Sequence, residues 1–455
     1  MAMGTERARP RGIAEHRNAG WFAVATVCFG AFMGQLDASI VTLTFPALQH
    51  EFTAPMAGVQ WVSLSYLLAL VALLAAAGRV ADAAGRKLMY GYGFGVFTAA
   101  SVACGLAPGL GWLIGFRVLQ AVGAAMLQAN SVALVVTSVP KAAMRPALGV
   151  QAAAQALGLA LGPALGGVLV STLGWRWVFL VNVPVGIAGM IAGRYLLPRT
   201  RERTPLGRFD HPGLALLAIA STTLLLAVSG VSGLRMPHWA PVVAATAAVL
   251  ALGGFRWREE HTGNPLIELS VLRPAAVRLG LLGALCGYLV LFGPLTLFPQ
   301  VLGTHGTAGL VLTGLPAGFG VAAVAADRVL PRRLAARGRM VLGAGIVVPG
   351  CAALALAPGS AALVGPVLFG IGMGLGLYIP ANNSSIMSAI PRRMSATGGG
   401  LVNMARGLGT ALGVALVTLC LHLASDSLAL AALGLFGVVA GVTGFAANGS
   451  RAARP

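Results

Sequence analysis

The segment "GRVADAAGRK", residues 78–87, is a short run of charged and small residues between two long apolar runs. A looser version, "ADRVLPRRLAARGR", occupies residues 326–339 and also lies between apolar runs. Two such segments predict a chain built from two related halves. Internal repeats of this kind are common in secondary transporters, whose binding sites lie between the repeats near the middle of the bilayer.

The composition indicates a membrane protein. Of the 455 residues, 57% are hydrophobic and only 9% are charged, and the mean hydropathy is +0.84. A soluble domain covers its surface with about 25% charged residues, which this chain lacks. Apolar runs of about 20 residues, each able to cross about 30 Å of hydrocarbon, recur along it. We therefore expect an all-α polytopic fold with fourteen spans, at residues 21–48, 57–79, 88–107, 110–138, 147–172, 176–196, 213–232, 239–255, 279–301, 307–326, 339–357, 361–381, 395–421 and 427–447.

The positive charges support this count, because Lys and Arg gather in alternate loops, as they do on the cytoplasmic side of membrane proteins. Of the 31 Lys and Arg residues, Arg176 and Arg235 fall in outer loops, and Arg117 and Arg406 fall inside spans. An odd number of spans would destroy the pattern. The Arg-, Ala- and Gly-rich composition indicates a bacterium with a GC-rich genome. We expect a multi-pass protein of the bacterial cytoplasmic membrane with both termini inside.

The repeat also predicts the domain organisation. Spans 1–6 and 9–14 would form two halves, at residues 21–198 and 261–450, joined by a linker at 199–260 that carries two inserted spans. Residues 1–20 and 451–455 would be cytoplasmic tails. The net charge of +19 follows the loop pattern, so no nucleic-acid partner is expected. The five cysteines lie in apolar runs without a CxxC pair, so neither a disulfide framework, a metal site nor a cofactor is expected.

One acidic residue, Asp37, lies deep in a span, whereas the other acidic residues and all seven histidines lie in or beside loops. An aspartate at the centre of a spanning helix costs about 2.5–3.5 kcal/mol on insertion scales. At 1.5 Å per residue it lies about 24 Å along the first span, and Arg117 lies at a similar depth in the fourth. Such a carboxylate could bind and release a proton as its arginine partner comes and goes, could contact a cationic substrate, or could form a permanent structural pair with Arg117.

Five motifs resemble the major facilitator superfamily, and in particular its fourteen-helix drug:proton antiporter branch. The segment with Gly78, Arg79, Asp82, Gly85, Arg86 and Lys87 is similar to the superfamily's signature loop between helices 2 and 3. The others are "RVLQAVGAA" (117–125), "GLALGPALGG" (158–167), "LDASIVTLTFP" (36–46) and "WRWVFLVNVPVG" (175–186). The resemblance covers nearly the whole chain and implies the major facilitator fold, no enzymatic activity and a monomeric transporter of small molecules and protons.

The resemblance also implies roles for two motifs. In the family, the signature aspartate, here Asp82, meets a helix N-terminus of the opposite half, here near Ser395, and holds the inner gate shut; a solvated charge at a helix end is the alternative. The helix-5 motif, with Gly158, Gly162, Pro163, Gly166 and Gly167, implies antiport. Read from its residues alone, it could equally be a surface of small side chains for close helix packing.

Polar and aromatic side chains in the spans are candidates to line a substrate cavity, although packing and interface anchoring are common roles for them. Arg406 either binds an anionic or carbonyl-bearing substrate or bonds to helix carbonyls between the halves. The full set of cavity candidates is Met33, Gln60, Tyr66, Gln120, Gln128, Gln151, Gln155, Tyr378, Asn382, Asn403 and Arg406.

The leading functional hypothesis is proton-driven export of small amphipathic drugs or antibiotics by alternating access. An uptake symporter, a lipid or lysolipid flippase and a non-transporting sensor are alternatives. An intramembrane enzyme is disfavoured, because no span contains a histidine. A nucleotide-driven pump is disfavoured too, because the chain has no GxxxxGK[ST] phosphate loop.

Overall fold

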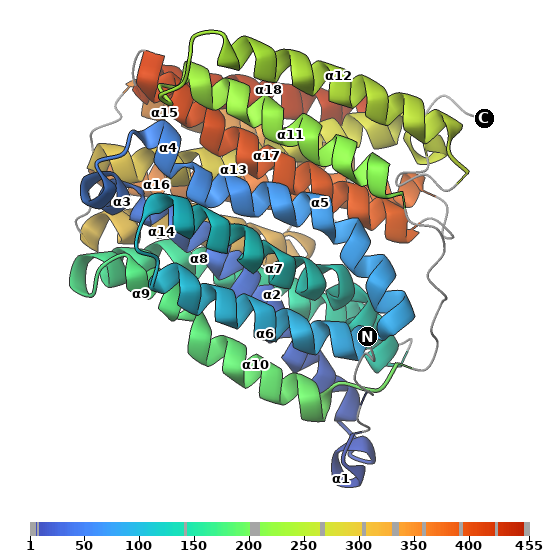
Figure 1. Cartoon of the computed structure of the whole chain (residues 1–455). Helices are drawn as coiled ribbons and strands as arrows, with labels where there is room; N and C mark the ends of the chain where they lie inside the picture. The colour runs from blue at the N-terminus through green and yellow to red at the C-terminus, as the bar shows by residue number, and fades with distance from the viewer. Residues whose placement is uncertain are drawn as a thin grey trace.

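The computed structural model describes residues 6, 9–140, 143–200, 210–263, 269–302, 306–329, 336–356, 361–390, 395–423 and 426–449. All secondary structure in these ranges is helical, as predicted (Figure 1). The elements are α1 (Arg11–Ala14), α2 (Ala19–Ile40), η1 (Val41–Thr44), α3 (Phe45–Phe52), α4 (Met56–Val59), α5 (Trp61–Ala84), α6 (Arg86–Gly105), α7 (Leu110–Ser138), α8 (Met144–Thr172), α9 (Arg176–Leu180), α10 (Asn182–Leu196), α11 (His211–Val231), α12 (Ala240–His261), η3 (Leu269–Leu272), α13 (Ala275–Leu302), α14 (Gly306–Val329), α15 (Ala336–Leu356), α16 (Ala361–Ala389), α17 (Ser395–Leu423) and α18 (Asp426–Gly449).

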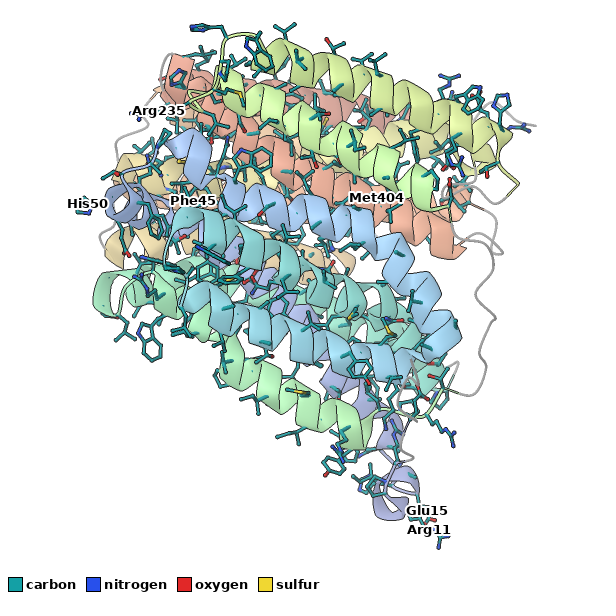
Figure 2. The ribbon with its side chains drawn as sticks, viewed as in Figure 1. Arg11, Glu15, Phe45, His50, Arg235 and Met404 are labelled. Carbon is teal, nitrogen blue, oxygen red and sulfur yellow. The ribbon has the colours of Figure 1, made fainter. Side chains whose placement is uncertain are left out.

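The long helices match the expected spans. In the described ranges, thirteen are long and apolar enough to cross a membrane, and α14 adds a shorter apolar stretch at Gly309–Ala323. With 24 residues, α14 as a whole is about 36 Å long, which is enough to cross. Labelled side chains outside the long helices lie at two opposite ends of the bundle: His50 and Arg235 at one end, Arg11 and Glu15 at the other (Figure 2).

Several helix ends differ from the prediction. Helices α12 and α16 continue past their expected ends at 255 and 381, to His261 and Ala389. The first span is not one helix to residue 48, because α2 ends at Ile40 and the 3-10 turn η1 precedes α3. Pro46, the second residue of α3, has no N–H to continue the helical bonding pattern. The expected loop at 78–87 is almost entirely helical: α5 continues to Ala84 and α6 starts at Arg86, with Gly85 alone between them at φ 115°. Glycine adopts that backbone conformation without strain.

The helices form two groups with α11 and α12 beside them (Figure 1). The blue-to-green helices α2–α10 make one group around a shared apolar core, and the yellow-to-red helices α13–α18 make the other around a second core. The groups contact each other through α5 with α17 and through α8 with α14. Helix α11 packs on α12, α17 and α5. This is the arrangement expected of two halves with an inserted pair.

Candidate functional site

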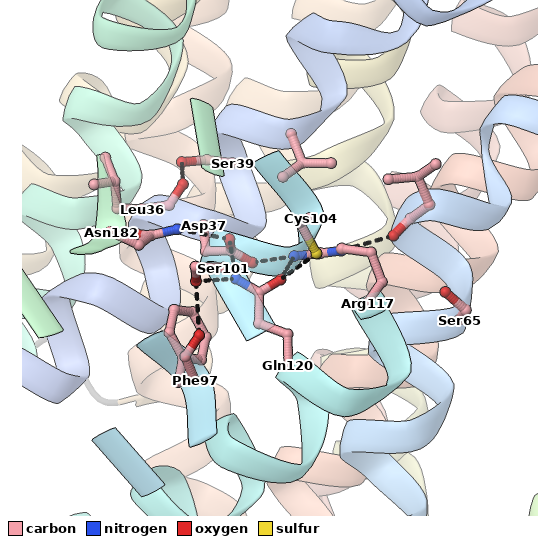
Figure 3. A network of polar contacts seen from close by, with 12 residues as sticks. Leu36, Asp37, Ser39, Ser65, Phe97, Ser101, Cys104, Arg117, Gln120 and Asn182 are labelled. Carbon is pink, nitrogen blue, oxygen red and sulfur yellow. Dashed lines mark hydrogen bonds and ion pairs between the residues drawn. The ribbon is translucent and has the colours of Figure 1, made fainter. Parts of the chain in front are cut away.

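Asp37 is fully buried in α2 and forms the predicted ion pair with Arg117 of α7 (Figure 3). The Asp37 Oδ2 atom is 2.6 Å from the Arg117 Nη1 atom. The other carboxylate oxygen, Oδ1, accepts hydrogen bonds of 3.1 Å from the side-chain amides of Gln120 and Asn182. Both oxygens therefore have donors, which is the condition under which a buried charge is tolerated.

Arg117 is equally well satisfied. Its Nε donates to the Val62 carbonyl of α5 at 2.8 Å, and Nη1 also donates to Gln120 Oε1 at 2.6 Å. Its guanidinium carbon lies 4.1 Å from the centre of the Tyr66 ring, in cation–π contact. Gln120 donates in turn to Ser101 of α6 at 2.8 Å. Side chains and backbone of α2, α5, α6, α7 and α10 thus meet in one polar network inside an apolar half.

A cavity lies between the two halves, next to this network. Its wall comes from α2, α5 and α7 on one side and from α13 and α17 on the other. Tyr66 belongs to both features, because its ring contacts Arg117 and also lines the cavity, whereas Asp37 does not line it. The lining residues are Gly34, Gln35, Ala38, Tyr66, Leu67, Leu70, Val71, Leu74, Gln128, Phe292, Asn403, Arg406, Gly407 and Thr410.

Five of the predicted cavity residues lie at cavities. Tyr66, Gln128, Asn403 and Arg406 line the cavity between the halves, and the Arg406 Nη2 atom donates to Gln128 Oε1 across it. Gln155 of α8 lines a smaller cavity, which also includes Gln128. These residues come from α5, α7, α8 and α17, so the polar groups of both halves converge on the same region.

The other predicted cavity residues in the N-terminal half lie outside these two linings. Gln120 belongs to the Asp37 network, and Met33 is buried in the apolar core of that half. Gln60 donates to the Ser229 hydroxyl of α11 at 2.9 Å, so it joins the inserted pair to the start of α5. Gln151 is buried in α8.

Tyr378 and Asn382 of α16 also lie elsewhere, inside the C-terminal half. The Tyr378 hydroxyl donates to the Ala440 carbonyl and the Asn382 amide to the Gly280 carbonyl, each at 2.8 Å. Both bonds link helices within one half. The sequence alone does not show which neighbouring helix a polar side chain faces. Here Tyr378 and Asn382 face backbone carbonyls of α18 and α13.

The end of the segment at 78–87 holds the start of α6 to the chain that follows α10. The Lys87 ammonium donates to the Leu197 carbonyl at 2.8 Å, and the Arg86 N–H donates to the Thr200 hydroxyl at 2.9 Å. Glu6 of the tail accepts from the Thr200 N–H at 2.8 Å, a contact that the sequence did not predict. The side chains of Arg79, Asp82 and Ser395 lie outside the described residues, so the expected gate contact is a prediction still.

The "GLALGPALGG" motif is a packing surface on two sides of α8. A Cβ added at Gly158 would lie 2.4 Å from the Phe32 carbonyl of α2, and one at Gly166 would lie 2.8 Å from Ile40. On the other side, a Cβ at Gly309 of α14 would lie 2.5 Å from the Pro163 carbonyl and 3.0 Å from the Gly167 Cα. The motif thus joins the helix that carries Asp37 to the opposite half.

Asn182 and Ser101 are members of the network that were not predicted. Asn182 is the one polar residue in "VFLVNVPVG", 178–186, and it is fully buried. A buried amide in an apolar run needs a partner, and this was the available signal. Ser101 gave no such signal, because a serine in a helix can bond to its own backbone, as Ser101 also does to Phe97 at 2.7 Å.

Comparisons with known proteins agree with the fold. The sequence profile of the Major Facilitator Superfamily matches residues 27–414. A protein of Yersinia enterocolitica with the name "Putative multidrug resistance protein MdtD" is 31% identical over 85% of this chain and 84% of its own length. The tetracenomycin C resistance and export protein of Streptomyces glaucescens is 29% identical over 87% of this chain and 75% of its own.

Two further matches differ in what they imply. The riboflavin transporter RibZ of Clostridioides difficile is 29% identical over 87% of both chains. Among solved structures, the peptide transporter PepTSo has a TM-score of 0.69 at 12% identity and covers 95% of this chain and 99% of its own. At that identity the likeness concerns the fold alone.

Proposed function

Because the chain belongs to the Major Facilitator Superfamily, we propose that it is a proton-driven antiporter that exports small amphipathic drugs or antibiotics. Its relatives include one with the name "Putative multidrug resistance protein MdtD" and one named as a tetracenomycin C resistance and export protein. The fold supplies two halves with a cavity between them, as alternating access requires. Both termini face the cytoplasm in this proposal, and the protein works as a monomer in the cytoplasmic membrane.

The observation that carries the proposal is the buried Asp37–Arg117 pair behind the cavity wall. A proton on Asp37 removes the negative charge, whereas Arg117 stays charged at all accessible pH values. Breaking one side of a buried ion pair costs about 3–5 kcal/mol, so protonation forces Arg117 to find new partners. Tyr66 packs on Arg117 and lines the cavity, so the rearrangement reaches the substrate site.

The two conformations of the transporter then alternate according to whether Asp37 holds a proton and whether the cavity holds substrate. A proton entering from outside loads Asp37 and favours the arrangement in which Arg117 has left it. Substrate entering from the cytoplasm occupies the cavity, and release of the proton to the cytoplasm restores the pair. Each state is stabilised by a ligand that binds it better than the other, which is what shifts a conformational equilibrium.

The test is substrate-driven proton movement in proteoliposomes. Purified wild-type protein under an imposed pH gradient should release protons when an amphipathic dye or antibiotic is added, and Asp37→Asn should not. Glu260→Gln is the matched control, because Glu260 is a half-exposed acid on α12 paired with Arg256. If Asp37→Asn moves substrate with the wild-type proton dependence, the carboxylate is a structural partner only and the proposal fails.

A second candidate is proton-coupled uptake of a small nutrient, which the similarity to a named riboflavin transporter supports. The proteoliposome assay distinguishes antiport from symport by the direction in which protons move relative to the substrate. In antiport, substrate and protons cross in opposite directions, so substrate export acidifies the compartment that it leaves. In symport they cross together and that compartment becomes alkaline.

A further inference from the structure

The cavity between the halves has a charge of one sign. Among its described lining residues, Arg406 is the one that carries a charge, and no lining residue is acidic. The nearest acid on the wall helices, Asp37, is fully buried and already accepts from Arg117, Gln120 and Asn182. A cationic substrate therefore finds no counter-charge in this cavity, whereas an anionic one does.

Arg406 has a neutral partner. Its described hydrogen bond goes to the Gln128 amide oxygen, across the interface between α17 and α7. A guanidinium has five N–H donors in a planar fork that matches a carboxylate or enolate. An arginine inside a membrane without an acid partner is costly, and a ligand that supplies the missing negative charge would offset that cost.

The surroundings of Arg406 define the rest of the ligand. Asn403 lies three residues before it and Thr410 four residues after it on α17, and both line the same cavity, so an amide and a hydroxyl flank the guanidinium. Apart from Gln35 and Gln128, the remaining wall is apolar or aromatic, with Tyr66 and leucines on α5 and Phe292 on α13. The ligand that fits has an apolar, aromatic body and one ionised oxygen group.

We propose that the transported substrates are amphipathic anions, with an ionised carboxyl, enol or phenol group held by Arg406 against Gln128. This inference rests on the proposed function and names the substrate class of that cavity. The charge of the substrate also sets how much net charge crosses the membrane in each exchange. Exchange of one anion outward for one proton inward moves two positive charges inward in effect, so an inside-negative membrane potential drives it. Exchange of a monocation for a proton would be electroneutral.

Binding to the purified protein tests the substrate class without transport, so it separates this inference from the proposed coupling. The probes are two dyes on one xanthene skeleton, fluorescein as the anion and rhodamine 6G as the cation, followed by fluorescence anisotropy. Wild type should bind fluorescein more tightly. Arg406→Gln should weaken fluorescein binding about ten- to a hundredfold, the loss expected for a charge-assisted hydrogen bond, and Arg406→Lys should weaken it less.

Two controls protect the result. Arg256→Gln removes the same charge from an exposed position on α12 and should leave fluorescein binding unchanged. An unchanged melting temperature of Arg406→Gln shows that the variant is folded; if it unfolds, Arg406→Lys carries the comparison. Tighter binding of rhodamine 6G by wild type, or fluorescein binding insensitive to Arg406, would overturn the inference.

Discussion

Tyr66 contacts Arg117 and also lines the cavity, and the ring and hydroxyl of its side chain have different roles. The ring stacks on the Arg117 guanidinium at 4.1 Å, whereas the buried hydroxyl has no hydrogen-bond partner among the described residues. Tyr66→Ala should open a water path to Asp37 and cause a proton leak without substrate. Tyr66→Phe keeps the ring and should stay tight. Proton influx into liposomes with a trapped pH dye measures both, and a Tyr66→Ala variant as tight as the wild type would show that the Tyr66 ring is not the seal.

Charge decided which site residues were predictable. Asp37 and Arg117 are conspicuous because an ionised group inside a span is costly and needs a reason, so the pair followed from the sequence. Neutral polar residues carry no such penalty once they find any partner. Gln60 bonds to Ser229, Asn382 to the Gly280 carbonyl, and Asn182 to Asp37. All three residues carry a side-chain amide, and only the three-dimensional neighbours distinguish a coupling network from a packing contact.

At the scale of helices, the contact between α8 and α14 predicts a conformational effect. A Cβ at Gly309 would meet the Pro163 carbonyl at 2.5 Å, and backbone atoms cannot move aside cheaply. Gly309→Ala should therefore push the halves apart where α8 meets the start of α14, and slow transport. Hydrogen exchange of the two helices should rise there while α2 and α7 stay protected.

The matched control for Gly309→Ala is Gly345→Ala on α15. Gly345 is also helical, but a Cβ there would have no heavy atom within 4 Å. The Gly345→Ala variant should have the same hydrogen exchange and the same transport rate as the wild type. If Gly309→Ala behaves in the same way, the contact between α8 and α14 does not constrain the transport cycle.

The length of the apolar runs was enough to predict that the helices exist, but not where they end. The charged run at 78–87 suggested a loop. However, "VADAA", 80–84, contains three alanines, the strongest helix former, and neither glycine nor proline, so α5 continues to Ala84. In the first span the helix is shorter than predicted, because α2 ends at Ile40. Its β-branched residues around 41–44 precede Pro46, and the local backbone turns into η1 instead of extending α2.

For the whole molecule, the even number of crossings depends on α14, the helix with the shortest apolar stretch. Its neighbours support a full crossing, because α14 packs along both α16 and α8. If all fourteen helices cross, the two termini share a side. If α14 does not cross, everything after it is inverted and the C-terminus lies opposite the N-terminus.

Fusion reporters distinguish these cases. Green fluorescent protein, which is fluorescent in the cytoplasm, should be bright when fused to the C-terminus of the whole chain and also when fused after Thr262, before α13. Alkaline phosphatase, active only outside, should be active when fused after Leu302, between α13 and α14. A dark full-length fusion combined with an active phosphatase fusion at the C-terminus would mean that α14 stays on one side. The positive charges of 326–339 would then face outward, against the rule that places Lys and Arg in cytoplasmic loops, so we expect the bright C-terminus.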